Sequence, residues 1–190
     1  MSRVVPSVDP WMAGEMFVSP HVEERRRGFA ILFGSEAARR SPLTPQLLAA
    51  RVDEPDLQLR VQIVQALADY FEIRGREYRY PPEIRAVVAG ALRKFERPHL
   101  LALLDLQRAR RAERDAAKLR PESLVRLLER IPNASAHLAR FAGDRAVSVA
   151  LRCAAIELIC HVGFTDARPT LEGLEARLEG RRAEIGRAHV

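Results

Sequence analysis

Helix-breaking residues divide this chain into short segments, and within each segment the apolar residues recur at helical spacing. Pro, Gly, Asn, Asp and Ser mark the breaks. No segment alternates between apolar and polar residues as a half-buried strand does. The sequence therefore predicts an all-α fold of about nine helices joined by short connections. The predicted helices cover residues 20–33, 45–52, 55–72, 82–95, 98–118, 121–131, 134–141, 146–162 and 169–182.

The composition favours the same fold class. Hydrophobic residues make up 47% of the 190 residues, which is enough to bury a core, whereas aromatic residues make up only 6%. Ala, Leu and Arg, which favour helices, are abundant, and the β-branched and aromatic residues that favour strands are comparatively few.

The first nineteen residues are the only part of the chain that looks extended. We treat 1–19 as an N-terminal arm and 20–190 as a single helical domain. The side chains of Trp11, Met12 and Phe17 make the arm too apolar for a free tail. We expect the arm to cover the first helix pair, as the ends of stacked helices require, with docking onto another chain as the alternative.

The predicted helix at 55–72 carries an arginine on its apolar face. With residues placed at about 100° steps around the helix axis, Arg60 lies opposite the polar strip of this helix. The pattern apolar-Arg-x-x-apolar-apolar-x-x-apolar occurs at Arg60, Arg85 and Arg152, and a looser copy contains Arg26. Chance alone would give about one match in a chain this rich in arginine and apolar residues.

This repeated pattern resembles the HEAT-repeat superfamily, particularly its short bacterial members. The resemblance implies an all-α, HEAT-like α-solenoid of about nine antiparallel helices. It also implies that an arginine early in the first helix of a repeat points inward and bonds acidic or backbone groups of a neighbouring repeat. Arg60 and Arg152 would hold this position, with Arg85 and Arg26 as further copies. We therefore predict that Arg60 is mostly buried and bonded to a carboxylate or a carbonyl.

Motifs that carry catalytic chemistry are absent from the sequence. It contains no phosphate-binding glycine loop, no paired CxxC, no HExxH and no GxSxG motif, and its five histidines lack metal-ligand spacing. The acidic residues at 53–56 are predicted to cap a helix rather than bind a metal. Cys153 and Cys160 are predicted to be buried, free thiols. The sequence thus predicts a non-enzymatic protein without a metal or cofactor.

The net charge of +6 permits nucleic acid, anionic membranes or acidic proteins as partners. Of the 31 basic residues, 29 are arginine, a bias that a GC-rich genome produces without selection for binding, so the charge alone assigns no partner. The first twenty residues lack the apolar run of an ordinary secretory signal. No apolar window is long enough to span a bilayer. We therefore expect a cytoplasmic protein that does not bind membranes.

Two arginine-rich stretches are candidate partner-binding sites. The stretch 74–83 is predicted to be a loop in which arginine alternates with tyrosine, a mixture suited to phosphate contact with base stacking or to an interface hot spot. Tyrosines packed under solvated arginines are the alternative. The stretch 107–120 holds six basic residues against two acidic ones, with ordinary i,i+4 pairing on a solvated helix as the alternative. The candidate residues are Arg74, Arg76, Tyr78, Arg79, Tyr80, Arg108, Arg110, Arg111 and Arg114.

The resemblance implies a function for the whole chain. It implies a non-enzymatic protein-interaction scaffold or adaptor that presents a curved helical-repeat surface to a protein partner. The alternative is a nucleic-acid-binding HEAT-like protein that uses its arginine-rich surfaces. That alternative predicts that 74–79 and 108–114 lie on one face and that binding weakens steeply with salt.

Overall fold

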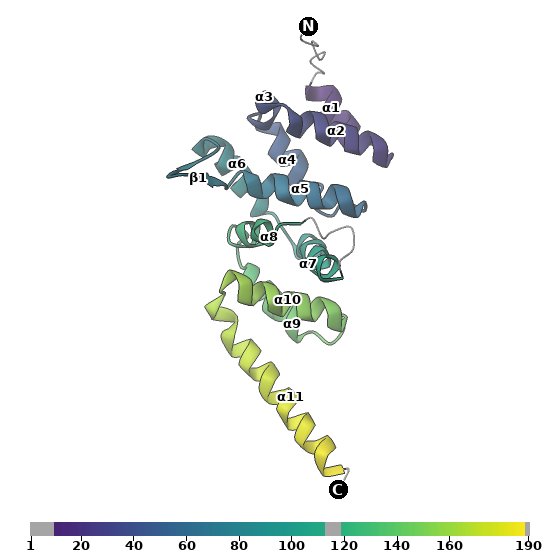
Figure 1. The fold of residues 1–190 in the computed structure, drawn as a ribbon, viewed down its shortest axis with the longest axis vertical. Coiled ribbons are helices and arrows are strands. Elements are labelled where there is room, and N and C mark those ends of the chain that lie inside the picture. Colours follow the sequence, from purple (N-terminus) through teal and green to yellow (C-terminus); the bar gives the residue numbers. More distant parts are fainter. Residues whose placement is uncertain (1–9, 113–118, 189–190) are drawn as a thin grey trace.

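The computed structural model describes residues 10–112 and 119–188, and within these ranges the chain forms eleven α-helices, one short 3₁₀ helix and one small β-hairpin (Figure 1). The prediction of an all-α fold is thereby confirmed. The α-helices are α1 (Pro10–Phe17), α2 (Val22–Gly34), α3 (Glu36–Arg39), α4 (Leu43–Ala49), α5 (Leu57–Asp69), α6 (Pro82–Leu92), α7 (Arg97–Arg111), α8 (Pro121–Leu128), α9 (Ala134–Gly143), α10 (Val149–Val162) and α11 (Arg168–Ala188).

The helices follow one another along the long axis of the molecule (Figure 1). Helices α1 to α4 lie at the N-terminal end, α5 to α8 lie in the middle, and α9 and α10 lie beyond them. Some of the main contacts join helices that follow one another in the chain, such as α1 on α2 and α9 on α10. Others skip helices: α4 packs on α6, α5 on α8, and α7 on α10. Helix α11 packs on α9 and then extends away from the other helices (Figure 1).

Every predicted helix has a counterpart, but the chain between 10 and 17 was wrongly expected to be extended. This segment forms α1 because Ala13 and Phe17, one helical turn apart, lie on one face and are fully buried. The helix packs against α2 at Gly28, where an added Cβ would lie only 2.5 Å from the backbone nitrogen of Phe17. The arm therefore covers α2, as expected, although Trp11 and Met12 remain exposed on its other side.

The predicted loop at 74–83 contains a β-hairpin that the sequence did not reveal. Strands β1 (Ile73–Arg74) and β2 (Glu77–Tyr78) pair antiparallel, with Ile73 opposite Tyr78. Gly75 occupies the turn with a φ of 66°, a conformation that a side chain disfavours. The chain then enters α6 at Pro82, a residue well suited to the first turn of a helix.

A run of aromatic contacts connects the N-terminal helices to this hairpin. Ring centroids lie 6.3 Å apart between Phe17 and Phe29, 5.8 Å between Phe29 and Phe33, and 6.4 Å between Phe33 and Tyr70. The run ends with Tyr80, whose ring centroid lies 4.7 Å from that of Tyr70. The C-terminal side of the hairpin is therefore anchored in the core through Tyr80, which is 4% exposed.

The arginine of the 55–72 segment lies as predicted. The Arg60 side chain is 13% exposed, and its Nη1 lies 3.3 Å from Oδ2 of Asp105 on α7. Arg152 bonds a backbone group instead: its Nε donates to the Ala142 carbonyl at 2.9 Å. Arg85 instead donates within its own segment, to the carbonyl of Tyr80 at 3.2 Å. It therefore links no neighbouring helix pair through this bond.

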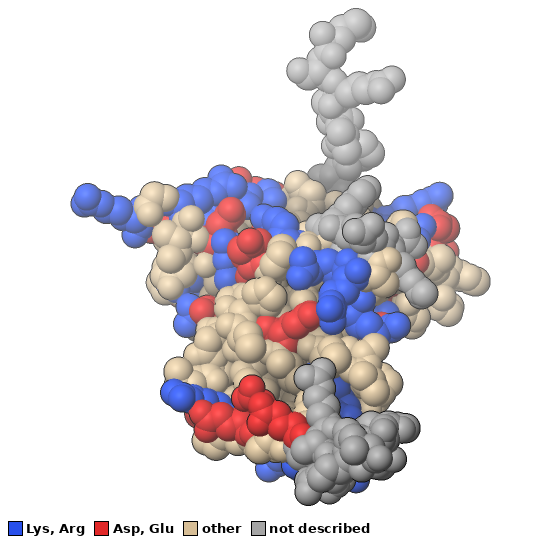
Figure 2. Space-filling model, turned by 60° about the horizontal axis from the view of Figure 1, so that its bottom comes forward, with Lys and Arg blue, Asp and Glu red and all other residues tan. Residues whose placement is uncertain are grey.

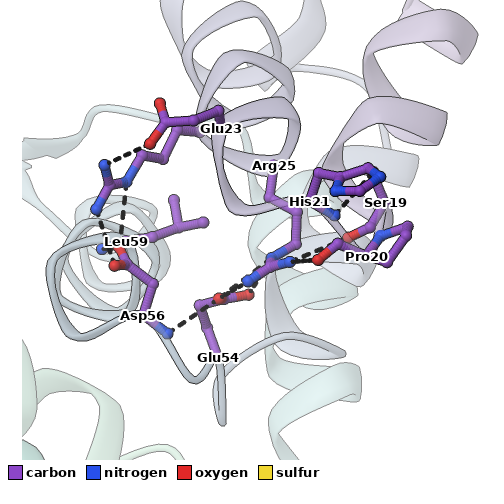
Figure 3. Close-up of polar contacts among 9 residues, drawn as sticks. Ser19, Pro20, His21, Glu23, Arg25, Glu54, Asp56 and Leu59 are labelled. Atoms are coloured by element: carbon purple, nitrogen blue, oxygen red, sulfur yellow. Dashed lines mark hydrogen bonds and ion pairs between the residues drawn. The ribbon is translucent and has the colours of Figure 1, made fainter.

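Helix α2 makes two ionic links to the segment that begins α5 (Figure 3). Arg26 bonds Asp56, the N-cap residue of α5, with 2.8 Å between Nη2 and Oδ2. Arg25, which the sequence pattern did not single out, bonds the fully buried Glu54, with 2.6 Å between Nη2 and Oε1. Of the acidic residues at 53–56, Asp56 caps α5 as predicted, since its carboxylate accepts the Leu59 N–H. Glu54 and Asp56 together hold α2 through Arg25 and Arg26.

The two cysteines are free thiols, but their predicted burial is wrong. Cys153 is half-buried and Cys160 is exposed, because no described helix covers the side of α10 on which Cys160 lies. In the described ranges, no helix combines the length and apolar character needed to cross a lipid bilayer.

Candidate functional site

The hairpin and the start of α6 border a basic cavity, which we call the hairpin hollow. Its volume is about 480 Å³. Four arginines and a single glutamate line it, so the cavity is suited to anions. The lining residues are Arg40, Arg76, Glu77, Tyr78, Arg79, Tyr80, Pro81, Pro82 and Arg85.

The two tyrosines of the hollow are packed rather than free. The ring of Tyr78 lies under the guanidinium of Arg85, whose Cζ is 3.7 Å from the ring centroid. Tyr80 packs against Tyr70 on one side, and the Cζ of Arg79 lies 5.3 Å from its ring centroid. Both contacts are cation–π interactions, which hold a guanidinium plane in place. Of the two alternatives left open for these tyrosines, the packed one describes Tyr80, whereas Tyr78 lies under Arg85 and is still 37% exposed.

Burial sets the acidity of the Tyr80 hydroxyl. Desolvation is the largest influence and raises the pKa of Tyr80 above its usual value, while the positive charges of Arg39 and Arg79 partly oppose the shift. The hydroxyl has no hydrogen-bond partner among the described residues. Burial likewise raises the pKa of Tyr70, whose hydroxyl donates to the carbonyl of Arg39 at 2.9 Å. Both tyrosines therefore remain neutral at physiological pH.

Three hairpin arginines are positioned by groups of their own segment. Arg79 and Arg74 both approach the carboxylate of Glu72, at 3.4 and 3.6 Å, and Arg85 is held by the carbonyl of Tyr80. Arg76 is exposed and forms no ion pair with another described residue. A guanidinium carries five N–H donors in a fixed plane, so each anchored arginine keeps donors for a further oxyanion.

The arginines of the second stretch are bonded within α7 and to α10. Nε of Arg108 donates to Asp105 at 2.9 Å, and Nε of Arg110 donates to Gln107 at 3.2 Å. Arg111 pairs with Glu157 of α10 at 2.9 Å. Arg114, the remaining candidate, lies outside the described residues. The end of α7 therefore acts as a junction between helices, and its arginines are largely engaged by protein groups.

The structure does not bring the two stretches together. Arg60, in the first turn of α5, reaches Asp105 and thereby the arginines of α7, whereas the hairpin follows the last turn of α5. A helix of 13 residues is about 20 Å long, so the two groups lie near opposite ends of α5. Figure 2 shows Lys and Arg in separate groups on the face that it displays, with Asp and Glu among them.

Sequence reasoning did not find two members of the hollow. Arg40 precedes the hairpin by more than thirty residues, and only the folding of α3 beside it brings the two together. Arg85 was assigned to a structural role between repeats. The sequence does indicate where Arg85 lies. Because α6 starts at Pro82, Arg85 falls in its first turn, beside the hairpin residues that lead into the helix.

The described part contains further cavities, two of them of comparable size. One, of about 470 Å³, lies between α4, α6 and the start of α7 and includes Lys94 and His99. The other, of about 430 Å³, lies between α9, α10 and α11 and includes Arg145 and Arg177. Neither lining combines a nucleophile with an adjacent base. Within the described ranges, no three His, Cys, Asp or Glu side chains are grouped so that they could hold a metal ion.

Searches against protein-family models, curated protein sequences and solved structures find no match to this chain.

Proposed function

We propose that this chain is a non-enzymatic protein-interaction scaffold whose helices form a HEAT-like α-solenoid, with the arginine–tyrosine hairpin as its docking site. The observation that carries the proposal is the hairpin hollow, a basic and aromatic concavity held at the side of a stack of helices. Function in such a protein comes from a surface that a rigid framework positions.

Links that arginines make between helices support the solenoid. The bonds of Arg26 to Asp56, Arg60 to Asp105 and Arg152 to Ala142 each join one helix to the beginning, middle or end of another. Buried arginines that connect successive helix pairs are the feature implied by the resemblance to HEAT repeats. The layered arrangement along one axis is also the arrangement of a stacked repeat (Figure 1).

The composition of the hairpin supports a protein partner. Arginine and tyrosine are the side chains most often found at interface hot spots. Ile73 is 57% exposed and lies across from Tyr78, which is 37% exposed. An exposed apolar pair beside a group of arginines resembles the mixed centre and rim of a protein–protein interface.

The nucleic-acid alternative has weaker support. Its two arginine-rich stretches lie near opposite ends of α5, and the arginines of α7 are engaged by Asp105, Gln107 and Glu157. A nucleic-acid backbone is best neutralised by a continuous row of free basic groups.

Affinity capture tests the proposal. The full chain is immobilised and exposed to nuclease-treated lysate of its own cells, in parallel with an Arg76→Glu/Arg79→Glu variant. We expect specific proteins on the wild-type chain that are reduced about tenfold or more on the variant, because charge reversal removes the attraction of the hollow. Each captured protein is then purified and titrated by calorimetry.

An Arg27→Glu/Arg140→Glu variant serves as the control, since both residues are exposed and lie on α2 and α9, away from the hairpin. Equal capture by all three chains would argue against the hairpin as the docking site. A parallel capture uses lysate without nuclease. Retention of nucleic acid and no protein there, if lost as the salt concentration rises, would favour the alternative function instead.

A further inference from the structure

We infer that the hairpin hollow binds an acidic segment of a partner protein, through the carboxylates of its Glu or Asp side chains. The inference rests on the proposed function and specifies the chemistry of its partner. It depends on three features of the hollow: its charge, the positions of its guanidinium groups, and the covered faces of its tyrosines.

The charge of the hollow is unbalanced by its own residues. Arg40, Arg76, Arg79 and Arg85 line it, against Glu77 alone. The acids that anchor two of these arginines, Glu36 and Glu72, do not belong to the lining and each contacts only part of a guanidinium. With Glu36 and Glu72 counted, the four arginines exceed the carboxylates by one, so one carboxylate of a partner would balance the charge, and further carboxylates would use the guanidinium donors that these acids leave free.

The guanidinium groups are held before any partner arrives. Arg85 is fixed twice, by the hydrogen bond from its Nε to Tyr80 and by its stacking on Tyr78, so its two terminal nitrogens remain to donate. Arg79 is fixed by Glu72 and by its contact with Tyr80. Groups that are already ordered lose little conformational entropy on binding, which favours recognition of a planar carboxylate by a planar guanidinium.

The tyrosines argue against a nucleic acid in this cavity. Recognition of single strands uses exposed aromatic faces on which bases stack. Here Arg85 covers a face of Tyr78, and Tyr80 is buried between Tyr70 and Arg79. The hollow therefore offers hydrogen-bond donors and at most one aromatic face for stacking, that of Tyr78 away from Arg85, since Tyr80 is buried. Ile73, exposed beside Tyr78 across the hairpin, adds a place for an apolar residue of the same peptide.

Nuclear magnetic resonance with a hexaglutamate peptide tests the inference. The full chain, labelled with ¹⁵N, is titrated at low ionic strength while the arginine Nε–H signals are followed. We expect saturable shifts at Arg79 and Arg85. An Arg40→Gln/Arg76→Gln variant should bind hexaglutamate about tenfold or more weakly, because two charge-assisted contacts are lost. Both residues are exposed, so the variant should retain the fold.

An Arg27→Gln/Arg140→Gln variant has the same change in net charge and should bind as the wild type does. Equal weakening in both variants, or no saturable shift at the hairpin, overturns the inference. Tighter binding of hexauridylate than of hexaglutamate at the hairpin also overturns it and assigns the hollow to nucleic acid. A chain that binds hexaglutamate there but captures no protein from lysate would refute the scaffold alone, whereas capture without hexaglutamate binding would refute only this inference.

Discussion

Arg25 and Glu54 form an ion pair that is almost completely enclosed by the protein (Figure 3). Glu54 is fully buried and Arg25 is 7% exposed. The guanidinium also donates to the carbonyls of Ser19 and Pro20, at 3.1 and 2.7 Å, and Glu54 accepts the N–H of Asp56 at 3.1 Å. One pair therefore joins α2, the turn that precedes it and the segment that begins α5.

Truncation of Glu54 should be strongly destabilising. Glu54→Ala leaves the charge of Arg25 buried and unpaired, so we expect the free energy of unfolding to fall by about 3–5 kcal/mol. Urea unfolding followed by circular dichroism measures the loss. The control is Glu36→Ala, which removes the exposed pair with Arg40 and should cost no more than about 1 kcal/mol. Similar losses in the two variants would show that the buried pair has no special weight.

Truncation of Arg60 should cost less, although its side chain is also mostly buried. Its partner Asp105 is 31% exposed and keeps a second bond, from Arg108, when Arg60 is removed. Arg60→Ala should therefore lower the free energy of unfolding by about 1.5–3 kcal/mol, the range for a lost hydrogen bond to a charged group. The same urea experiment, with Arg60→Ala and Glu54→Ala side by side, checks the order. A greater loss from Arg60→Ala would contradict this account of Asp105.

The charge of Asp56 should contribute to stability in a pH-dependent way. Partial burial opposes its ionisation, but the hydrogen bonds from the Leu59 N–H and from Arg26 outweigh it and lower the pKa of Asp56. The contribution is therefore complete above the ordinary pKa of 3.8 and disappears as the pH falls through the lower value of the folded protein. Asp56→Asn retains a helix cap but loses the charge.

We thus expect the stability difference between wild type and Asp56→Asn to be constant near neutral pH and to shrink steadily below about pH 4. Urea unfolding at a series of pH values measures it. Asp53→Asn is a control on the same turn, since Asp53 is exposed. A difference that stayed constant down to pH 2 would rule out the ionised Arg26–Asp56 pair as its source.

The buried tyrosines should make the protein sensitive to alkali. Because burial raises the pKa of Tyr70 and of Tyr80, their contribution to stability is complete below the ordinary value of 10.0 and is lost as the pH rises above it. At pH 7, Tyr80→Phe removes a buried hydroxyl without a partner and should be neutral or stabilising. Tyr70→Phe removes a bond to the Arg39 carbonyl and should cost about 1 kcal/mol.

Thermal unfolding at pH 7 and at pH 10.5 would compare these variants with the wild type. The difference in Tm between pH 7 and pH 10.5 should be smaller for Tyr80→Phe than for the wild type. If Tyr80→Phe were as costly as Tyr70→Phe at pH 7, its hydroxyl would have to be bonded in the folded protein.

Two glycine substitutions should have opposite effects. A Cβ at Gly28 would lie 2.5 Å from the Phe17 nitrogen and 2.7 Å from the Ala13 carbonyl oxygen, both backbone atoms, so Gly28→Ala should cost about 1–3 kcal/mol by forcing α1 away. A Cβ at Gly90, in the last turn of α6, meets nothing within 4 Å. Gly90→Ala should stabilise by up to about 1 kcal/mol. Thermal unfolding of the two variants measures both signs, and a stable Gly28→Ala would show that α1 is loosely attached.

The helices were predictable because their boundaries depend on local chemistry. Asp56 and Pro82 mark the starts of α5 and α6 in the sequence as they do in the structure. The α1 segment was missed because its proline and its glycine resemble a loop, whereas the burial of Phe17 depends on its packing against Gly28 in the next helix. The hairpin was missed for a similar reason, since two strands of two residues are too short to show alternation.

Partners of the arginines were less predictable than their burial. The pattern placed Arg60 correctly on a buried face, but Asp105 is 45 residues away and nothing local connects the two. Arg25 and Arg26 are adjacent, and only the packing of α2 against the start of α5 decides which of them is enclosed. The hollow depended likewise on Arg40, whose approach to the hairpin follows from the tertiary arrangement.

The order of the helices along the molecule also has a kinetic consequence. Because α5 packs on α8 and α7 on α10, each across more than thirty intervening residues, these long loops must close before the centre of the core can form, and folding should be slower than in a bundle where only adjacent helices touch. The two ends should also open independently of the centre. Amide hydrogens of α1 and α11 would then exchange with solvent while those of α5 and α7 remain protected.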